Sequence, residues 1–502
     1  LTQTMKWEKL SHLEHVLKRP DSYVGSTKCD TELSWVLDSN KNFFVKKNLS
    51  YTPALLKIFD EILVNALDQN AVNPKQTTKI DVNVSTKTGE ICVTNNGTGI
   101  PIVKHETEKV WVPELIFGTL LTSSNYDDNE QRVTGGRNGY GAKLTNIYSK
   151  AFNLTVKDPT NHLQCTWKWS DNMSKLTPAK PTKYAGKDGE VSITFVPDWA
   201  KLSMSGLTSD FYRVIEKRVW DTAVCSRSGL KVSFQGEKIP VHKLLDYAEM
   251  HEGVDNAVAH SDASGDWDVV VAPSNYAGFQ QVSWVNGICT TKGGTHVDYV
   301  ANSISKDIIN ELLKKKADGA DKLKPTNVKS TMFMFVRSTI VNPSFSSQIK
   351  SECTSKSSEF GTKFEYPPKF MKSILATGIQ DELLSVAKFK EQKELKKSDG
   401  TKKNKISGIP KLDDANWAGG PKSSRCTLII TEGDSAKALA ISGLSVVGRD
   451  EYGVFPLRGK PRNVRDASVK QLMSNQEFSD LKKILGLQQD KTYTVSYTHL
   501  TL

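Results

Sequence analysis

The residues of the first part of the chain best suited to chemistry are Glu61, Asn65 and Asp68, which recur at offsets of four and seven. An α-helix turns once in about 3.6 residues, so this spacing places all three side chains on one helical face. A carboxylate there can orient and deprotonate a water molecule, and an amide oxygen one turn away can bind Mg²⁺, which prefers oxygen ligands. A solvated polar face has the same spacing, so this motif is weak by itself.

A second motif, Asn95-Asn96-Gly97-Thr98-Gly99, stands directly after a strand-like run. Its two glycines allow the backbone to approach a ligand closely. An Asn side chain offers both a hydrogen-bond donor and an acceptor, which suits the edge of an adenine base. A plain loop at the end of a hairpin is the alternative interpretation.

A third motif, residues 134–143, contains four glycines and ends in Lys143, where a helix-like run over 142–148 begins. Backbone N–H groups at a helix N-terminus bind anions, and the lysine adds positive charge. Ala142 separates this lysine from the last glycine, so the segment is not a Walker A loop. We favour phosphate binding for this motif.

The hydrophobic pattern predicts the elements that would position these motifs. Apolar residues recur at helical spacing over 52–68, and alternation over 80–84 and 91–93 predicts a hairpin. Further strands are expected near 191–196, 230–234, 268–272, 281–285 and 331–335, with helices over 297–313 and 381–397. Residues 426–431 are predicted to form a short buried strand of another unit. A chain of 502 residues with this mixture of predicted helices and strands is expected to be a multidomain α/β and α+β protein.

The three motifs, taken in this order, resemble the GHKL ATPase superfamily. Within it, residues 13–25, 120–128 and 134–143 are similar to eukaryotic-type DNA topoisomerase II. The resemblance extends from about Trp7 to about Thr494. It implies a GHKL (Bergerat) α/β sandwich over 1–244, a ribosomal S5-like transducer domain over 245–395 and a partial, Rossmann-like TOPRIM domain over 425–495. A lysine-rich linker over 396–424 and a non-native tail over 496–502 complete the expected organisation.

The resemblance also implies roles for single residues, with ATP and Mg²⁺ as cofactors. Glu61 would be the general base for the attacking water, Asn65 would bind Mg²⁺ and Asn95 would face the adenine. The residues implied to contact the sugar and the phosphates are Ser123, Ser124, Asn125, Arg137, Asn138, Gly139, Tyr140, Gly141 and Lys143. Trp7 stands where the family usually has a tyrosine, in a strap that crosses to the partner subunit.

A loop over 341–350 resembles the family segment that carries a Q-T-K triplet, with Ile349 in place of the threonine. Gln348 and Lys350 would then belong to the catalytic set. A lysine that reaches the γ-phosphate from another domain would make the position of that domain depend on the nucleotide. From the residues alone, a surface loop with a solvated lysine is the alternative.

Glu432 follows the predicted strand 426–431 and precedes a predicted helix, in a segment that resembles the TOPRIM motif. Sites in open α/β sheets form at the carboxyl ends of strands, so Glu432 is placed to hold Mg²⁺ or to move a proton. The alternative interpretation is that Asp434 or Ser435 caps the helix that follows, and both interpretations can hold together. Further along, Arg458 and Lys460 suit contacts to DNA phosphates, with a solvated basic face as the alternative.

Composition and charge limit the function classes. The net charge of +11 is compatible with a polyanionic partner, and charge alone does not distinguish such a partner from solubility. There is no apolar run long enough to span a membrane, and no secretory leader is expected. The seven cysteines form no C-x-x-C pair, so a reducing compartment is expected and a structural zinc site is not.

These expectations combine into an ATP-dependent enzyme of double-strand passage, acting on double-stranded DNA as a nuclear homodimer. The expected TOPRIM carboxylate cluster and the tyrosine that cleaves DNA do not appear in the sequence, so only ATP hydrolysis is expected of this chain alone. Three alternatives stay open: a GHKL clamp for chaperone or mismatch-repair partners, a bacterial gyrase-type subunit, and a non-cleaving remnant that only binds.

Overall fold

The computed structural model describes residues 9–38, 42–122, 131–135, 139–226, 229–317, 319–385, 408–458, 467, 469–489 and 491–493. The chain divides into two compact units, which we call the first and the second unit. The first comprises Leu1–Ala317 and Leu323–Leu383, and the second comprises Asp318–Lys322 and Leu384–Leu502. Trp7 and the expected tail over 496–502 lie outside the described residues.

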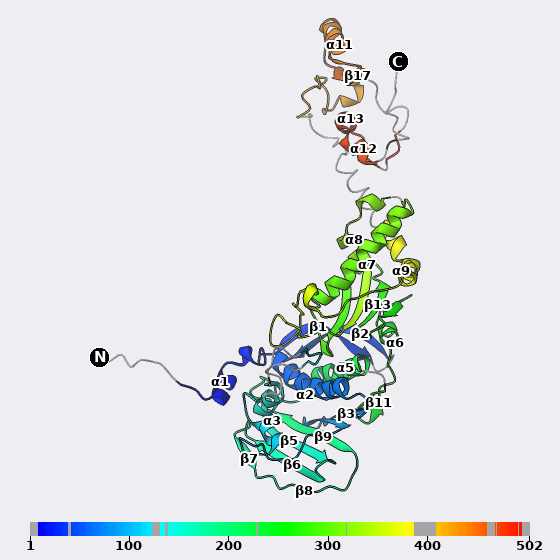
Figure 1. Cartoon of the computed structure of the whole chain (residues 1–502). Coiled ribbons are helices and arrows are strands. Elements are labelled where there is room, and N and C mark those ends of the chain that lie inside the picture. Colours follow the sequence, from blue (N-terminus) through cyan, green and yellow to red (C-terminus); the bar gives the residue numbers. More distant parts are fainter. Residues whose placement is uncertain are drawn as a thin grey trace, which may run out of the picture. The chain divides into compact units, whose positions relative to one another are not determined.

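The larger sheet of the first unit has nine strands in the order β11-β10-β3-β4-β9-β5-β6-β7, with β8 paired to β6. Its strands are β3 Lys79–Val84, β4 Ile91–Gly97, β5 Ser149–Asp158, β6 Leu163–Ser170, β7 Lys175–Thr177, β8 Thr182–Lys183, β9 Gly189–Pro197, β10 Lys231–Phe234 and β11 Glu237–Lys238. Buried side chains alternate along β4 and β9, so one face of the sheet is covered. Figure 1 shows α2 (Pro53–Val72) beside α5 (Ser209–Cys225), and both contact this sheet.

Shorter elements surround this sheet. They are α1 His12–Lys18, the antiparallel pair β1 Asp30–Asp38 and β2 Phe43–Tyr51, α3 Val112–Gly118 and α4 Gly141–Ile147. The helix predicted over 52–68 is confirmed as α2, and the predicted hairpin is confirmed as the antiparallel pair of β3 and β4. Pro53 starts α2 at the first helical position, where the missing N–H of proline has no helical acceptor to lose.

The smaller sheet of the first unit has five strands in the order β12-β13-β16-β14-β15. Its strands are β12 Val258–Ser261, β13 Trp267–Pro273, β14 Gln280–Val285, β15 Ile288–Cys289 and β16 Met332–Ser338. The helices of this part of the chain are α6 Leu244–Glu249, α7 Thr295–Lys314, α8 Pro325–Lys329 and α9 Pro368–Ile374. The strands β14 and β16 are parallel, and the crossover between them contains α7 and α8. The strands and the helix predicted between 268 and 335 are confirmed here.

The helix predicted from 381 is confirmed at its start: residues 380–385 are helical, and 386–397 lie outside the described residues. A separate helix, α9, precedes it from Pro368, and a π-helical turn over Leu375–Ile379 with a kink at Gly378 (φ +102°) lies between the two. Pro368 occupies the first helical position, which is a start signal that the hydrophobic pattern alone does not carry.

In the second unit, β17 (Thr427–Thr431) pairs in parallel with β18 (Tyr452–Pro456), and α11 (Asp434–Val447) connects them. Two helices, α12 (Val469–Ser474) and α13 (Gln476–Leu485), follow. The strand expected at 426–431 is confirmed as β17, but its expected burial is wrong, because Ile430 is 42% exposed. The reason is that the described sheet of this unit has only two strands, so β17 lacks cover.

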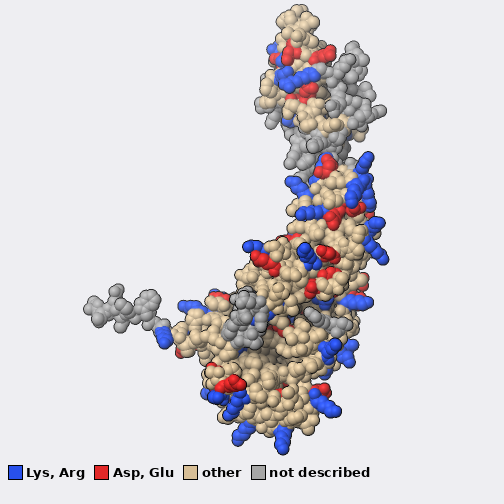
Figure 2. All heavy atoms as spheres, in the orientation of Figure 1, with Lys and Arg blue, Asp and Glu red and all other residues tan. Residues whose placement is uncertain are grey.

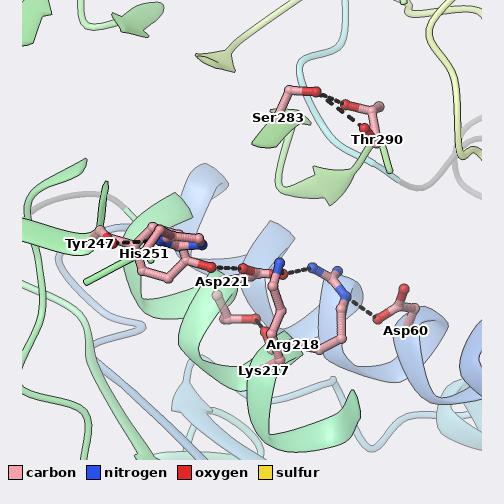
Figure 3. A network of polar contacts seen from close by, with 9 residues as sticks. Asp60, Lys217, Arg218, Asp221, Tyr247, His251, Ser283 and Thr290 are labelled. Carbon is pink, nitrogen blue, oxygen red and sulfur yellow. Dashed lines mark hydrogen bonds and ion pairs between the residues drawn. The ribbon is translucent and has the colours of Figure 1, made fainter. Parts of the chain in front are cut away.

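Figure 3 shows buried polar contacts that join α2, α5 and α6 within the first unit. Asp221 on α5 is fully buried, and one of its oxygens accepts hydrogen bonds from Lys217 at 2.9 Å and Arg218 at 2.8 Å. Its other oxygen accepts a hydrogen bond from the Tyr247 hydroxyl at 2.6 Å. Arg218 also donates to Asp60 on α2 at 2.8 Å, so one guanidinium group ties the two helices together.

Replacing Asp221 with alanine would leave Lys217 and Arg218 buried without their shared anion. We expect the free energy of unfolding to fall by about 3–5 kcal/mol, the cost of breaking a buried ion pair on one side. Urea denaturation followed by tryptophan fluorescence measures this loss. Glu311→Ala is the control, because it breaks an exposed pair with Lys314 and should leave the midpoint unchanged. Equal midpoints for Asp221→Ala and the parent would contradict this account of the network.

Candidate functional site

Glu61 lies on α2 and is only 8% exposed, so its face of the helix is not the solvated polar face that the sequence also allowed. Its Oε1 forms an ion pair with Lys57, one turn earlier on the same helix. The ammonium group of Lys350 approaches the same oxygen at 3.7 Å from the loop over 341–350. The structure therefore brings together two predicted site residues and one lysine that the sequence analysis missed.

The charge state of Glu61 follows from these neighbours. Burial by itself raises the pKa of this carboxyl group, but the ammonium groups of Lys350 and Lys57 outweigh burial and lower the pKa to about 2. Glu61 is therefore a carboxylate at neutral pH, although it is buried. Burial also lowers the pKa of the Lys57 ammonium group, and the neighbouring Glu61 acts in the opposite direction.

Gly141, the first residue of α4, packs directly against this carboxylate. A Cβ atom at Gly141 would lie 1.9 Å from Glu61 Oε2, which is far inside van der Waals contact. No other residue fits here without moving Glu61. The two oxygens of Glu61 thus have different surroundings: Oε1 meets the lysines, and Oε2 faces the glycine at the end of the 134–143 segment.

Lys143 is almost completely buried and donates hydrogen bonds to two backbone carbonyl oxygens. Its Nζ lies 2.5 Å from the oxygen of Thr122 and 2.6 Å from that of Gly139. Burial lowers its pKa to about 8. Thr122 directly precedes residues 123–130 and Gly139 directly follows residues 136–138, and both of these ranges lie outside the described residues. Ser123, Ser124, Asn125, Arg137 and Asn138 therefore cannot be placed, whereas Gly139 and Tyr140 precede α4.

Asp68, the third member of the helical motif, holds the glycine-rich segment against α2. Its Oδ1 accepts a hydrogen bond from the Gly135 backbone N–H at 2.9 Å. A Cβ atom at Gly135 would lie 2.7 Å from a methyl group of Val64, so this glycine permits the close approach. Asn65 is half-buried on the same helix and has an amide oxygen of the type that Mg²⁺ accepts.

The loop over 341–350 is fastened to the same segment. Lys350 donates to the carbonyl oxygen of Gly135 at 3.0 Å, and Asn342 donates its backbone N–H to the carbonyl of Arg132 at 2.9 Å. Ile349 packs on Gly25, where a Cβ atom would lie 2.5 Å from its terminal carbon. Gln348 is half-buried in this loop. The alternative of a free surface loop with a solvated lysine is therefore wrong.

The Asn95 motif lies at the end of β4, and Asn95 is 8% exposed. Its Nδ2 donates to the carbonyl of Asn96 at 3.0 Å. At both glycines the chain itself occupies the space of a side chain: a Cβ atom would lie 2.6 Å from Thr77 Oγ1 at Gly97 and 2.5 Å from the Lys157 carbonyl oxygen at Gly99. Both glycines therefore serve internal packing.

In the second unit, Glu432 is exposed at the turn between β17 and α11. No group of three or more His, Cys, Asp or Glu residues able to hold a metal occurs among the residues with described positions. The alternative of a cap by Asp434 or Ser435 is wrong. The N-cap of α11 is Gly433, which has no side chain to cap the helix, and Asp434 pairs with Lys411 at 3.2 Å. Arg458 is exposed, and Lys460 lies outside the described residues.

The lowered pKa of Lys143 predicts a pH dependence of stability. The unfolded chain keeps this lysine protonated up to its ordinary value of 10.5, whereas the folded chain releases the proton near pH 8. Between these values the unfolded state binds more protons, so stability relative to Lys143→Met should rise with pH. Urea midpoints at about pH 7 and about pH 10 test this. Lys168→Met, at an exposed position on β6, controls for loss of a positive charge, and a flat difference for Lys143 would contradict the expectation.

Comparison with known proteins gives this geometry a family. The family model of the histidine kinase-, DNA gyrase B- and HSP90-like ATPase matches residues 51–201, and the DNA gyrase B model matches residues 233–402. The DNA topoisomerase 2 of Bombyx mori is 48% identical, over 97% of this chain and 32% of that protein. The chain thus spans about a third of the length of this curated relative.

Two solved structures agree with this assignment. The ATPase region of Saccharomyces cerevisiae topoisomerase II is 39% identical with a TM-score of 0.71, over 76% of this chain and 99% of that structure. The ATPase and transducer domains of DNA topoisomerase II from Balamuthia mandrillaris are 39% identical with a TM-score of 0.74, over 78% and 100%. The larger sheet is therefore a GHKL ATPase fold and the smaller one a gyrase B-type transducer fold, and the chain belongs to the eukaryotic DNA topoisomerase II family.

Proposed function

We propose that this chain is the ATP-operated part of a DNA topoisomerase II that passes one DNA double strand through another. In this proposal it binds and hydrolyses ATP, and ATP closes two copies around a DNA segment. The observation that supports it best is the contact of Lys350, on a loop of the transducer fold, with the buried Glu61 of the ATPase fold. A base and a cation supplied by two folds are what a nucleotide-operated clamp requires.

Glu61 is the proposed general base. It is charged at neutral pH, and its Oε2 faces Gly141 and the glycine-rich segment where the phosphates are proposed to bind. A carboxylate in that place orients the attacking water and accepts its proton. Catalysis of phosphoryl transfer depends mainly on such positioning and on charge stabilisation, so a rigid helix is a suitable support.

Lys350, with Gln348 beside it, is the proposed sensor of the γ-phosphate. Its ammonium group now lies between Glu61 and the Gly135 carbonyl, so it is already at the edge of the glycine-rich segment. A γ-phosphate there would compete with Glu61 for this cation, and hydrolysis would release it. The transducer loop would then move with the nucleotide state.

The remaining ATP contacts are proposed for Asn95, for Ser123, Ser124 and Asn125, and for residues 137–141 with Lys143. Asn65 fits Mg²⁺ by its donor chemistry, because this cation keeps most of its waters and takes few protein oxygens beside the phosphates. When bound, Mg²⁺ would neutralise charge that develops on the phosphates. Glu432 is proposed to bind a different Mg²⁺ ion, in a TOPRIM domain.

Double-stranded DNA is the proposed partner. Figure 2 shows Lys and Arg side chains gathered over the part of the first unit that holds α7 to α9. Exposed lysines there include Lys314, Lys315, Lys316 and Lys324. Exposed lysines neutralise phosphates without reading sequence. Arg458 and Lys460 are proposed DNA contacts of the second unit.

The proposed location is the nucleus, where a eukaryotic enzyme of this family meets its DNA. Among the helices that the structure describes, none combines the length and the apolar character needed to cross a membrane.

Glu61→Gln should abolish ATP hydrolysis and preserve nucleotide binding, because it removes the base and keeps the shape of the side chain. We expect kcat to fall by about 10²–10⁴-fold, the usual contribution of a general base. Steady-state hydrolysis and the affinity for a non-hydrolysable ATP analogue measure the two effects. Glu249→Ala, at an exposed position on α6, is the control. Turnover close to that of the parent would refute the assignment of Glu61.

Binding of a non-hydrolysable ATP analogue with Mg²⁺ should convert the chain from monomer to dimer. The reason is that the proposed clamp closes on ATP binding and opens after hydrolysis. Sedimentation velocity with and without the analogue measures the change. A monomer that persists when the analogue is demonstrably bound would contradict the clamp, and Trp7 and Ile349 would then be the first positions to restore to tyrosine and threonine.

A further inference from the structure

Lys57 is a buried lysine that the proposed mechanism does not use. Its side chain is 4% exposed and lies one helical turn before Glu61, with which it forms an ion pair. Lysine is almost never fully buried unless it is paired, so the fold accepts this residue because of Glu61. The charged groups that act on the pair are Lys350 from the 341–350 loop and Asp60 from α2 itself.

The two lysines that meet Glu61 Oε1 differ in how they are held. Lys57 shares α2 with Glu61, so their separation is set by one turn of helix. Lys350 belongs to a loop of the transducer fold and also donates to the Gly135 carbonyl. Any movement of that loop takes Lys350 away and leaves Lys57 in place.

A buried carboxylate that loses its only cation becomes strongly unfavourable, and it responds by taking up a proton. A protonated Glu61 cannot accept a proton from water. The proposed departure of Lys350 to the γ-phosphate would therefore disable the base at the moment of hydrolysis, unless a second cation stays behind. Lys57, which lies on the same helix as Glu61, can do so.

We propose that Lys57 is a positioning residue for Glu61: it keeps the carboxylate charged and holds Oε1, so that Lys350 can leave for the γ-phosphate while Oε2 stays turned toward Gly141. This inference rests on the proposed hydrolytic role of Glu61. Lys57 touches neither the water nor the nucleotide in this scheme, and it acts only through Glu61. A purely structural ion pair, which only stabilises α2, is the competing explanation.

The test follows the titration of Glu61 itself, in the full chain labelled with ¹³C at the glutamate carboxyl carbon and assigned by loss of its signal in Glu61→Gln. In Lys57→Met, we expect the Glu61 titration and the acid limb of kcat to move upward by at least about one pH unit, because one of two cations is gone. Affinity for a non-hydrolysable ATP analogue should stay within about threefold, and kcat should fall by at least about tenfold. Lys57→Arg, which restores the charge, should bring the titration back.

Lys217→Met is the matched control, since Lys217 forms another buried pair at the same helical spacing, with Asp221 on α5. It should lower the melting temperature and leave the Glu61 titration unchanged. If Lys57→Met does not fold, Lys350→Met carries the test, because Lys57 is then the remaining cation beside Glu61. Loss of Lys350 should raise the Glu61 titration as well, but Lys57 should still keep Glu61 ionised at neutral pH.

An unchanged Glu61 titration in Lys57→Met, or a Glu61 that is protonated at neutral pH in Lys350→Met, would overturn the role of Lys57. Failure of the proposed function has a different signature. In that case Glu61→Gln would hydrolyse ATP as fast as the parent, whatever the titration shows. The carboxyl signal reports on Lys57 even in a chain without turnover, so the two results are read separately.

Discussion

The charge of Glu61, kept inside the protein by two lysines, is the interaction on which the rest of the site depends. A buried carboxylate is stable only with cations beside it, and here one comes from its own helix and one from another fold. The loop that brings Lys350 must therefore be held at a defined distance from α2. Three hydrogen bonds hold the loop at that distance: from Lys350 to Gly135, from Gly135 to Asp68 and from Asn342 to Arg132.

The same helix is tied to the remainder of the first unit from its other side. Asp60 binds Arg218, which shares Asp221 with Lys217 and with Tyr247 of α6 (Figure 3). Beyond α5, Arg337 of β16 donates to the carbonyl oxygens of Val224 and Ser226 at 2.9 and 3.2 Å. Two consecutive residues of α2 thus face different parts of the first unit. Glu61 faces the proposed reaction, and Asp60 binds the network that leads to the transducer fold. A nucleotide-driven movement therefore has a physical connection between the site and that fold.

Family membership answers the question that the motifs left open, because the relatives are topoisomerases over nearly the whole chain and not chaperones or mismatch-repair ATPases. It does not replace the local physics. Ile349, where the family has threonine, packs its side chain on Gly25. The loop therefore keeps its place through an apolar contact, and Lys350 still reaches Glu61.

The sequence by itself determined the element types and most boundaries within a few residues, and family likeness predicted that Lys350 belongs to the same site as Glu61. Periodicity and glycine placement are local properties, so they predict α2, the β3–β4 hairpin and α4. Only the tertiary structure decided that Glu61 is buried, that Lys57 shares its charge, and that Gly97 and Gly99 allow close packing against Thr77 and Lys157. Burial and close approach depend on segments far apart in sequence, and no spacing along one segment encodes them.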